Sequence, residues 1–202
     1  MIRGVLLLFT RAPVPGETKT RLIPLLGVQG AAEFHEIVLS ETLANAKASI
    51  FETVEIWCEP DINHTFLQQC SLDFSSTLHI QHGNDLGERM HHATNEALVI
   101  NNFVVLIGSD CPAITTDILN QSYQALSSGK DAVLGPSYDG GYYLIGLKKT
   151  NPGIFQDISW GKSDVADKTR RILNRQGLDY VELEELTDID TPDDYQKYIR
   201  HC

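Results

Sequence analysis

The sequence predicts an α/β protein, built as a three-layer α/β/α sandwich around a mainly parallel central sheet. Two unbroken apolar runs, Val5–Phe9 and Phe103–Ile107, are typical of strands that are buried on both faces. Strand and helix patterns alternate through most of the 202 residues, without an internal repeat. The length suits one domain, so we expect residues 1–202 to fold as a single unit.

The remaining elements follow from apolar spacing, capping residues and turn residues. The expected strands are Val5–Phe9, Thr53–Cys58, Leu78–His82, Phe103–Ile107, Asp131–Leu134, Tyr142–Leu147 and Tyr180–Leu183. The expected helices cover 30–48, 62–73 (weakly), a segment from Asn84 or Asp85 to about Val99, one that starts at Thr115 or Thr116, one from Ser163 to Gly177, and a last one capped by Thr191.

The net charge restricts the possible partners. Lys and Arg number 16 and Asp and Glu 27, which gives a net charge of -11. Because such a surface repels nucleic acid and anionic membranes, we expect neither as a partner. A phosphate-bearing ligand would need a local cluster of cations.

The cysteines and the N-terminal run favour a cytoplasmic protein. The four cysteines form no CxxC pair and no metal-ligand spacing, as expected of reduced thiols. The run Val5–Phe9 is too short for the apolar part of a signal sequence, and Arg11 follows shortly after. We therefore expect no export signal and no membrane span.

The loop after the first strand concentrates positive charge. Arg11, Lys19 and Arg21 lie within eleven residues, and Gly16 interrupts the segment between them. Backbone N–H groups and cations in such a loop suit phosphate oxygens, and the alternative is a solvated flexible loop. The loop matches neither GxxxxGK[ST] nor GxGxxG.

Carboxylates follow the later strands. Asp110 stands where the buried run 103–107 ends, although an Asp there can also merely cap a turn. Asp188 and Asp190 flank Ile189 ahead of the last helix. If these loops open on one edge of the sheet, Asp110 and the Asp188/Asp190 pair could share Mg²⁺ or Mn²⁺ with phosphate oxygens. Without a cation, two carboxylates ~4 Å apart repel by about 4 kcal/mol at an effective dielectric of ~20.

The segment Asp139-Gly140-Gly141 has two possible interpretations. Between two strands it is a hairpin signal. Alternatively, the two glycines let the backbone approach a substrate, with Asp139 accepting from hydroxyls and Tyr142 alongside. Arg89 could face solvent or a ligand, and the histidines are expected at the surface or in the core.

Six motifs resemble the bacterial selenodomain-associated transferases of the glycosyltransferase-A, or nucleotide-diphospho-sugar transferase, superfamily. They cover nearly the whole chain in order: APVPGxxKTRL (12–22), LGERM (86–90), GSDCP (108–112), GPxxDGGYYLIG (135–146), WGxSDV (160–165) and DIDTPDD (188–194). The resemblance implies a single nucleotide-binding domain of that fold with a divalent metal. It implies metal ligands at Asp110 and Asp190 and phosphate-binding cations at Lys19 and Arg21.

The sequence departs from the superfamily at two places. The glycine pair of standard sugar nucleotidyltransferase loops is missing between Phe9 and Lys19, and the Asp-x-Asp of many glycosyltransferases is reduced to Ser109-Asp110. The departures leave nucleotidyl and glycosyl transfer both open.

The leading hypothesis is a transferase that acts on a nucleoside triphosphate or nucleotide sugar and a small-molecule acceptor. Its expected catalytic residues are Asp110, Lys19 and Asp139; its expected nucleotide and phosphate ligands are Arg11, Gly16, Lys19, Arg21 and Arg89; its expected substrate contacts are Asp139, Gly140, Gly141 and Tyr142. A catalytically inactive nucleotide-binding or regulatory module of the same fold is the alternative, and a phosphohydrolase is a weaker third. The sequence does not specify the oligomeric state.

Overall fold

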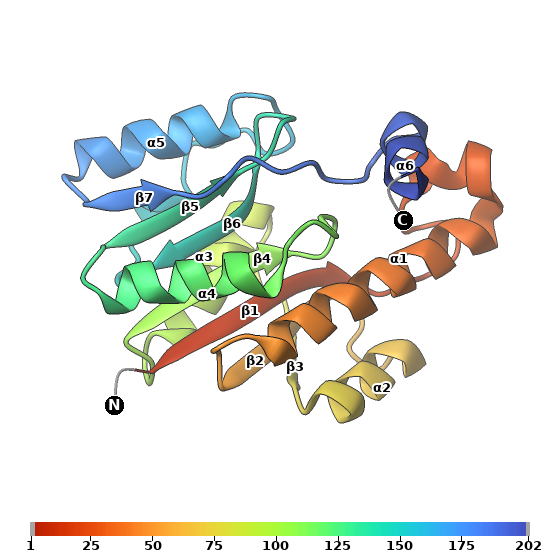
Figure 1. The fold of residues 1–202 in the computed structure, drawn as a ribbon, viewed down its shortest axis with the longest axis horizontal. Coiled ribbons are helices and arrows are strands. Elements are labelled where there is room, and N and C mark those ends of the chain that lie inside the picture. Colours follow the sequence, from red (N-terminus) through yellow and green to blue (C-terminus); the bar gives the residue numbers. More distant parts are fainter. Residues whose placement is uncertain (1–2, 201–202) are drawn as a thin grey trace.

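A seven-stranded sheet forms the middle layer of the computed structural model, which describes residues 3–200 (Figure 1). Its order is β3-β2-β1-β4-β6-β5-β7, and β6 is antiparallel to both of its neighbours, whereas the other pairs are parallel. The predicted fold class is confirmed. The strands are β1 (Gly4–Arg11), β2 (Thr53–Glu59), β3 (Thr77–Ile80), β4 (Phe103–Gly108), β5 (Ala132–Pro136), β6 (Tyr142–Leu147) and β7 (Tyr180–Glu182).

Helices cover both faces of the sheet (Figure 1). One face carries α1 (Ile23–Ala48), α2 (Thr65–Phe74) and α4 (Thr116–Ser127), and the other carries α3 (Leu86–Ala97) and α5 (Val165–Arg175). The last helix, α6 (Pro192–Ile199), packs against α1. Two short 3₁₀ helices, η1 (Thr20–Leu22) and η2 (Pro152–Ile154), complete the described chain.

The alternation of side chains along β1 builds two cores. Leu6 and Leu8 pack with the layer of α1, α2 and α4, while Val5 and Leu7 pack with the layer of α3 and α5. All four are fully buried. Each such side chain contributes about 1.5–3 kcal/mol of transfer free energy, which explains why an unbroken apolar run is needed in a strand covered on both faces.

Helix α1 is long and apolar. By length and composition alone, Thr20–Ala48 could span a membrane. One such helix is weak evidence of a membrane span, because a core helix passes the same test. The backbone leaves helical geometry at Gly27, with φ 74° and ψ 170°, and Leu39 and Leu43 are fully buried against the sheet. Packing inside the fold therefore explains the apolar face of this helix.

The helix caps mostly follow the sequence. Asp85, Thr115 and Thr191 each accept a hydrogen bond from a backbone N–H in the first turn of the following helix, as expected of cap residues. The expected cap at Ser163 is wrong, because α5 begins at Val165 with Asp164 in the cap position.

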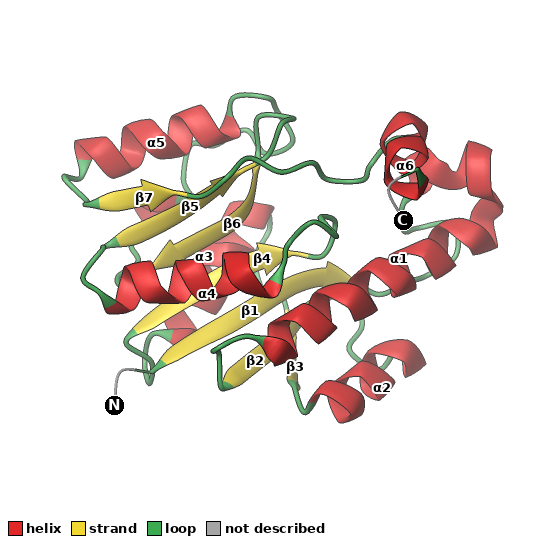
Figure 2. Cartoon of the chain, in the orientation of Figure 1, coloured by secondary structure: helices red, strands yellow, loops and turns green. Residues whose placement is uncertain are grey.

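The functional loops gather at one edge of the sheet. β1, β4, β5 and β7 run in the same direction, so the segments that follow them leave from the same side (Figure 2). The antiparallel β6 starts at this side, and the predicted hairpin 137–141 therefore lies there too. Segment 183–191 then runs from β7 along this side to α6 (Figure 1).

Candidate functional site

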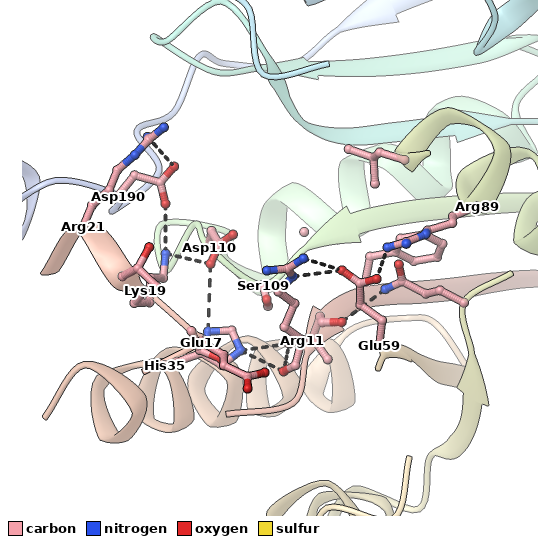
Figure 3. A pocket seen from close by; sticks show the side chains of 17 residues that line it. Arg11, Glu17, Lys19, Arg21, His35, Glu59, Arg89, Ser109, Asp110 and Asp190 are labelled. Carbon is pink, nitrogen blue, oxygen red and sulfur yellow. Dashed lines mark hydrogen bonds and ion pairs between the residues drawn. The ribbon is translucent and has the colours of Figure 1, made fainter. Parts of the chain in front are cut away.

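Lys19 joins three segments that are far apart in the sequence (Figure 3). Its Nζ lies 2.6 Å from Oδ1 of Asp110, 3.2 Å from Oδ1 of Asp190 and 2.6 Å from the carbonyl oxygen of Ile189. The Lys19 side chain is only 4% exposed, whereas the two carboxylates are nearly half exposed. Lys19 has left-handed backbone angles, φ 49° and ψ 41°, which a non-glycine residue adopts at a cost and often at functional sites.

The charges in this cluster stabilise one another. Burial lowers the pKa of Lys19, but Asp110 and Asp190 together raise it by more than burial lowers it, so the net shift is upward. Burial raises the pKa of Asp110, but the charge and hydrogen bond of Lys19 lower it more, so the net shift is downward. The cluster is therefore an ammonium between two carboxylates. Arg21 adds a fourth charge, with Nη1 3.8 Å from Oδ2 of Asp190.

A cavity of about 550 Å³, which we call the main cavity, opens over this cluster. Six of the expected site residues line it: Arg11, Lys19, Arg21, Arg89, Asp110 and Asp190. Gly16 is not among the lining residues; its φ of +89° serves the turn that carries Lys19 into the cavity.

A second charged group lies across the main cavity from Lys19 (Figure 3). Oε1 of Glu59, the last residue of β2, accepts from Nε of Arg11 at 2.9 Å and lies 2.8 Å from its Nη2. Oε2 of Glu59 pairs with Nη1 of Arg89. The carboxylate holds both guanidinium groups beside the cavity, where their remaining N–H groups can face a ligand. Nothing in the sequence marked Glu59, since its partners are 30 and 48 residues away.

His35 of α1 also lines the main cavity, although the sequence favoured only a surface or core role. Its Nε2 lies 3.1 Å from both Oγ1 of Thr10 and the carbonyl oxygen of Arg11. Its Nδ1 is buried, has no hydrogen-bond partner among the described residues and lies 3.9 Å from Oδ1 of Asp110. Burial lowers the pKa of His35 despite Asp110, so the ring is neutral at physiological pH.

A smaller cavity of about 190 Å³, which we call the second pocket, adjoins the main cavity. The two share Phe9, Leu86 and Gly108. Its other lining residues include Asp139, Gly141 and Tyr142 from the expected substrate set, and Trp160 and Asp188 in addition.

Gly140, the remaining expected substrate residue, is in close contact with protein backbone. A Cβ on it would lie 2.0 Å from the carbonyl oxygen of Ser163, and its φ is +87°. Its N–H donates to the carbonyl of Ser137, and its own carbonyl accepts from the N–H of Ala166. The missing side chain therefore lets the hairpin pack against the start of α5.

Asp188 is the least compensated carboxylate of the site. Its Oδ2 accepts from Oγ of Ser137 at 3.3 Å, while its Oδ1 is buried without a hydrogen-bond partner in the described chain. Burial and the neighbouring Asp110, Asp139 and Asp190 raise its pKa to about 7. The second pocket, which Asp188 lines, thus favours hydrogen-bond donors and positive charge.

The donor set at Asp110 and Asp190 suits a hard divalent cation. Oxygens of both carboxylates already converge on one cation, the Lys19 ammonium. Mg²⁺ is commonly held by one or two carboxylates, with water and substrate phosphates in its other positions. Among residues 3–200, no group of three or more His, Cys, Asp or Glu side chains has metal-binding geometry. The site fits a metal shared with a substrate better than a metal held by protein alone.

Sequence comparison identifies the family. Residues 42–162, more than half of the chain, match the family described as "Uncharacterized protein conserved in bacteria (DUF2064)". The chain belongs to the DUF2064 family. Among curated proteins, none matches this DUF2064 chain in sequence.

A solved structure from Desulfovibrio desulfuricans G20 is similar over the full length. It is described as a candidate nucleotide-diphospho-sugar transferase, with 32% sequence identity and a TM-score of 0.90, and the alignment covers 100% of the DUF2064 chain and 88% of the other. The fold of the nucleotide-diphospho-sugar transferases, which the resemblance implied, is therefore confirmed.

More distant structures share the fold alone. A cytidylyltransferase from Leptospira borgpetersenii has 15% identity and a TM-score of 0.63, with 98% of the DUF2064 chain and 85% of the other covered. Rv0371c from Mycobacterium tuberculosis, in a complex with manganese, has 15% identity and a TM-score of 0.57, with 100% and 99% covered.

Proposed function

We propose that the chain is a divalent-metal-dependent transferase that binds a nucleoside triphosphate or a nucleotide sugar in the main cavity and transfers a nucleotidyl or glycosyl group to a small acceptor. The observation that carries the proposal is the contact of Lys19 with both Asp110 and Asp190 inside that cavity. A cation that could bind phosphate and two carboxylates that could hold a metal therefore lie together, which supports the proposal.

The charge distribution of the main cavity favours a polyphosphate. Four cations line it, Arg11, Lys19, Arg21 and Arg89, beside four carboxylates, Glu17, Glu59, Asp110 and Asp190, in a chain with a net charge of -11. A bound metal would neutralise Asp110 and Asp190, which leaves the cations in excess. The cations stand in two groups on opposite sides of the cavity (Figure 3). A nucleotide could contact the Arg11–Arg89 pair with one part and Lys19 with its phosphates.

Both reaction types release an anion that these residues can stabilise. In nucleotidyl transfer, an acceptor oxygen attacks the α-phosphorus and the bond to pyrophosphate breaks. In glycosyl transfer, the acceptor oxygen attacks the anomeric carbon and the bond to a nucleoside diphosphate breaks. Lys19 and Arg21 would neutralise the charge that develops on the leaving oxygens. Asp139 would accept a hydrogen bond from a substrate hydroxyl.

Asp110 and Asp190 would hold Mg²⁺ or Mn²⁺ together with phosphate oxygens. When bound, the metal supplies charge neutralisation at the phosphates. The manganese complex of Rv0371c concerns a distant protein of the same fold and supports this assignment only in general terms. Lys19 now stands between the two carboxylates, so we expect its ammonium to move toward the phosphates when a nucleotide and metal bind.

The test is a screen of nucleoside triphosphates and nucleotide sugars with Mn²⁺ and a mixture of acceptors. Enzyme-coupled assays would detect pyrophosphate and nucleoside diphosphate separately. We expect one of the two products to form. EDTA should abolish its formation, and Asp110→Asn should lower the rate at least 100-fold.

Thermal denaturation in parallel identifies the bound nucleotide. A ligand at 100 times its dissociation constant adds about 2.7 kcal/mol to the free energy of unfolding. Nucleotide binding that persists in EDTA without turnover would overturn the transferase in favour of the inactive module. Release of phosphate from simple esters would instead indicate a phosphohydrolase.

A further inference from the structure

The second pocket has walls of two kinds. Its apolar part includes Met90 and Leu106, together with Tyr142 and Trp160. The Tyr142 and Trp160 rings meet edge to face, with centroids 6.2 Å apart and an interplanar angle of 84°. They therefore form a corner against which one flat ligand ring can lie.

Trp160 is held in place by a close contact with α3. A Cβ on Gly87 would lie 2.8 Å from Nε1 of Trp160 and 2.5 Å from the carbonyl oxygen of Phe155. Only a residue without a side chain allows this approach. The indole is therefore positioned before any ligand arrives, which lowers the entropic cost of binding against it.

The polar part of the pocket is acidic. Oδ1 of Asp139 accepts from the N–H of Gly141 at 2.8 Å, which fixes the carboxylate at the pocket. Asp188 contributes the buried Oδ1 that has no partner in residues 3–200. Among the described lining residues, only Lys162 is cationic, and it is exposed. An unpartnered buried acceptor favours a ligand that donates a hydrogen bond.

The two cavities therefore differ in their cations. The main cavity has four cations beside four carboxylates, two of which a metal would neutralise, and so suits phosphates, whereas the second pocket has two carboxylates and one exposed lysine. A phosphorylated acceptor in the second pocket would place like charges side by side. Like charges at such short range repel, so a phosphorylated ligand is disfavoured there.

We propose that the second pocket is a binding site for a single ring that bears hydrogen-bond donors and no negative charge, with the ring stacked against Trp160 and its hydroxyl or ammonium groups donating to Asp139 and Asp188. This inference rests on the proposed function, because it takes the ring to be part of the acceptor or of the transferred sugar. Its volume of about 190 Å³ suits one ring and excludes a whole nucleotide.

Saturation-transfer NMR with three matched probes tests the proposal without turnover. The probes are glucose, glucosamine and glucose 6-phosphate, which share one ring and differ in charge. We expect signals that depend on Trp160 from the first two probes, whereas any signal from the phosphate ester should come from the main cavity and be the same in Trp160→Ala. A stronger signal from glucosamine would assign the donor as an ammonium, and equal signals would assign it as hydroxyl.

Trp160→Ala should weaken binding of the neutral ring about ten-fold, equivalent to ~1.4 kcal/mol, while Asp139→Asn should restore some binding of the phosphate ester. Tyr138→Ala is the matched control, because this exposed aromatic residue of the same hairpin does not line the pocket. Binding of glucose 6-phosphate that depends on Trp160 and is as strong as that of glucose, or equal binding of the neutral ring in Trp160→Ala and the original chain, would overturn the proposal.

Nucleotide binding to the same samples separates this proposal from the proposed function. If Trp160→Ala binds the nucleotide normally and the neutral ring still fails to bind the unchanged protein, only the second-pocket proposal fails. If the ring binds as expected but no nucleotide binds or is consumed, the transferase proposal fails and the second pocket stands.

Discussion

At the scale of single residues, Lys19 decides the electrostatics of the site. We expect Lys19→Met to lower the free energy of unfolding by about 1–2 kcal/mol in EDTA, because Asp110 and Asp190 lose the ammonium between them. The loss is smaller than for a fully buried pair, since both carboxylates are nearly half exposed. Mn²⁺ should restore the stability, and its affinity for nucleotide-free protein should rise. Denaturation in urea and calorimetric titration measure both.

Lys130→Met is the control for this prediction. It removes an exposed pair with Asp179, Nζ to Oδ1 at 2.8 Å, and should cost under ~1 kcal/mol with no recovery in Mn²⁺. Equal stability of Lys19→Met in EDTA and in Mn²⁺ would show that the ammonium and the metal do not compete for one position.

Asp188 predicts a dependence of stability on pH. The pKa of its carboxyl is about 7 in the folded chain and ~3.9 when unfolded. Below pH 4 both states are protonated and the group has no effect. Between pH 4 and 7 the unfolded state ionises first, so stability falls as the pH rises, by at most about 4 kcal/mol, and the loss is complete above pH 7. Asp188→Asn in EDTA should therefore gain stability over the original chain progressively across this range.

Asp193→Asn is the matched control, since this exposed carboxylate lies in the first turn of α6 and benefits from the helix dipole. It should lose a little stability at neutral pH. A constant difference between Asp188→Asn and the original chain from pH 4 to pH 8 would mean that Asp188 has an ordinary pKa in the folded protein.

Sequence reasoning found the residues whose chemistry is visible locally. Lys19, Asp110 and Asp190 stood out by charge and by their position after strands. In the structure, Nζ of Lys19 lies within 3.2 Å of a carboxylate oxygen of each aspartate. Their catalytic roles stay predictions. Glu59 and His35 were missed, because their importance depends on contacts 24 to 48 residues away that no local pattern encodes.

At the scale of elements, α6 positions a site residue that it does not contain. Thr191 and Asp194 form a capping box, with Asp194 N–H 3.3 Å from Oγ1 of Thr191 and Thr191 N–H 3.0 Å from Oδ2 of Asp194. Thr191→Ala should cost about 1 kcal/mol of stability. Because Asp190 is the preceding residue, Mn²⁺ affinity should also fall several-fold, as measured by calorimetry.

Ile172→Val in α5 provides a variant of similar destabilisation at a distance. This buried substitution also costs about 1 kcal/mol and should leave Mn²⁺ affinity unchanged. Equal Mn²⁺ affinities in Thr191→Ala and Ile172→Val would show that the cap stabilises α6 without orienting Asp190.

The elements themselves were largely predictable, because each depends on its own residues. All seven expected strands are present, with ends that shift by a few residues. The hairpin signal of Asp139-Gly140-Gly141 was also confirmed. The function of Gly140 was not predictable, because a missing side chain looks the same whether it faces a substrate or, as here, the Ser163 backbone.

At the scale of the whole molecule, the net charge of -11 opposes the ligand that the cavity attracts. The distant charges act over the Debye length, which is ~30 Å at 0.01 M salt and ~8 Å at 0.15 M, whereas the cavity contacts act at close range. We expect the association rate constant of a nucleoside triphosphate to rise about two- to ten-fold over this range of salt. Stopped-flow fluorescence measures it.

An uncharged nucleoside should associate equally fast at both salt concentrations. A rate constant for the triphosphate that falls with salt would mean that the local cations already dominate the field outside the cavity. The overall charge would then have no influence on nucleotide capture.

The position of Trp160 gives this protein a built-in optical probe. The chain has two tryptophans, and Trp57 is buried in β2, with Nε1 donating to Glu55 at 2.9 Å and its ring stacked on His79. Its emission should respond little to events in the cavities. In a Trp57→Phe variant, the remaining fluorescence would come from the wall of the second pocket alone, so quenching by an added compound would report occupancy there in real time.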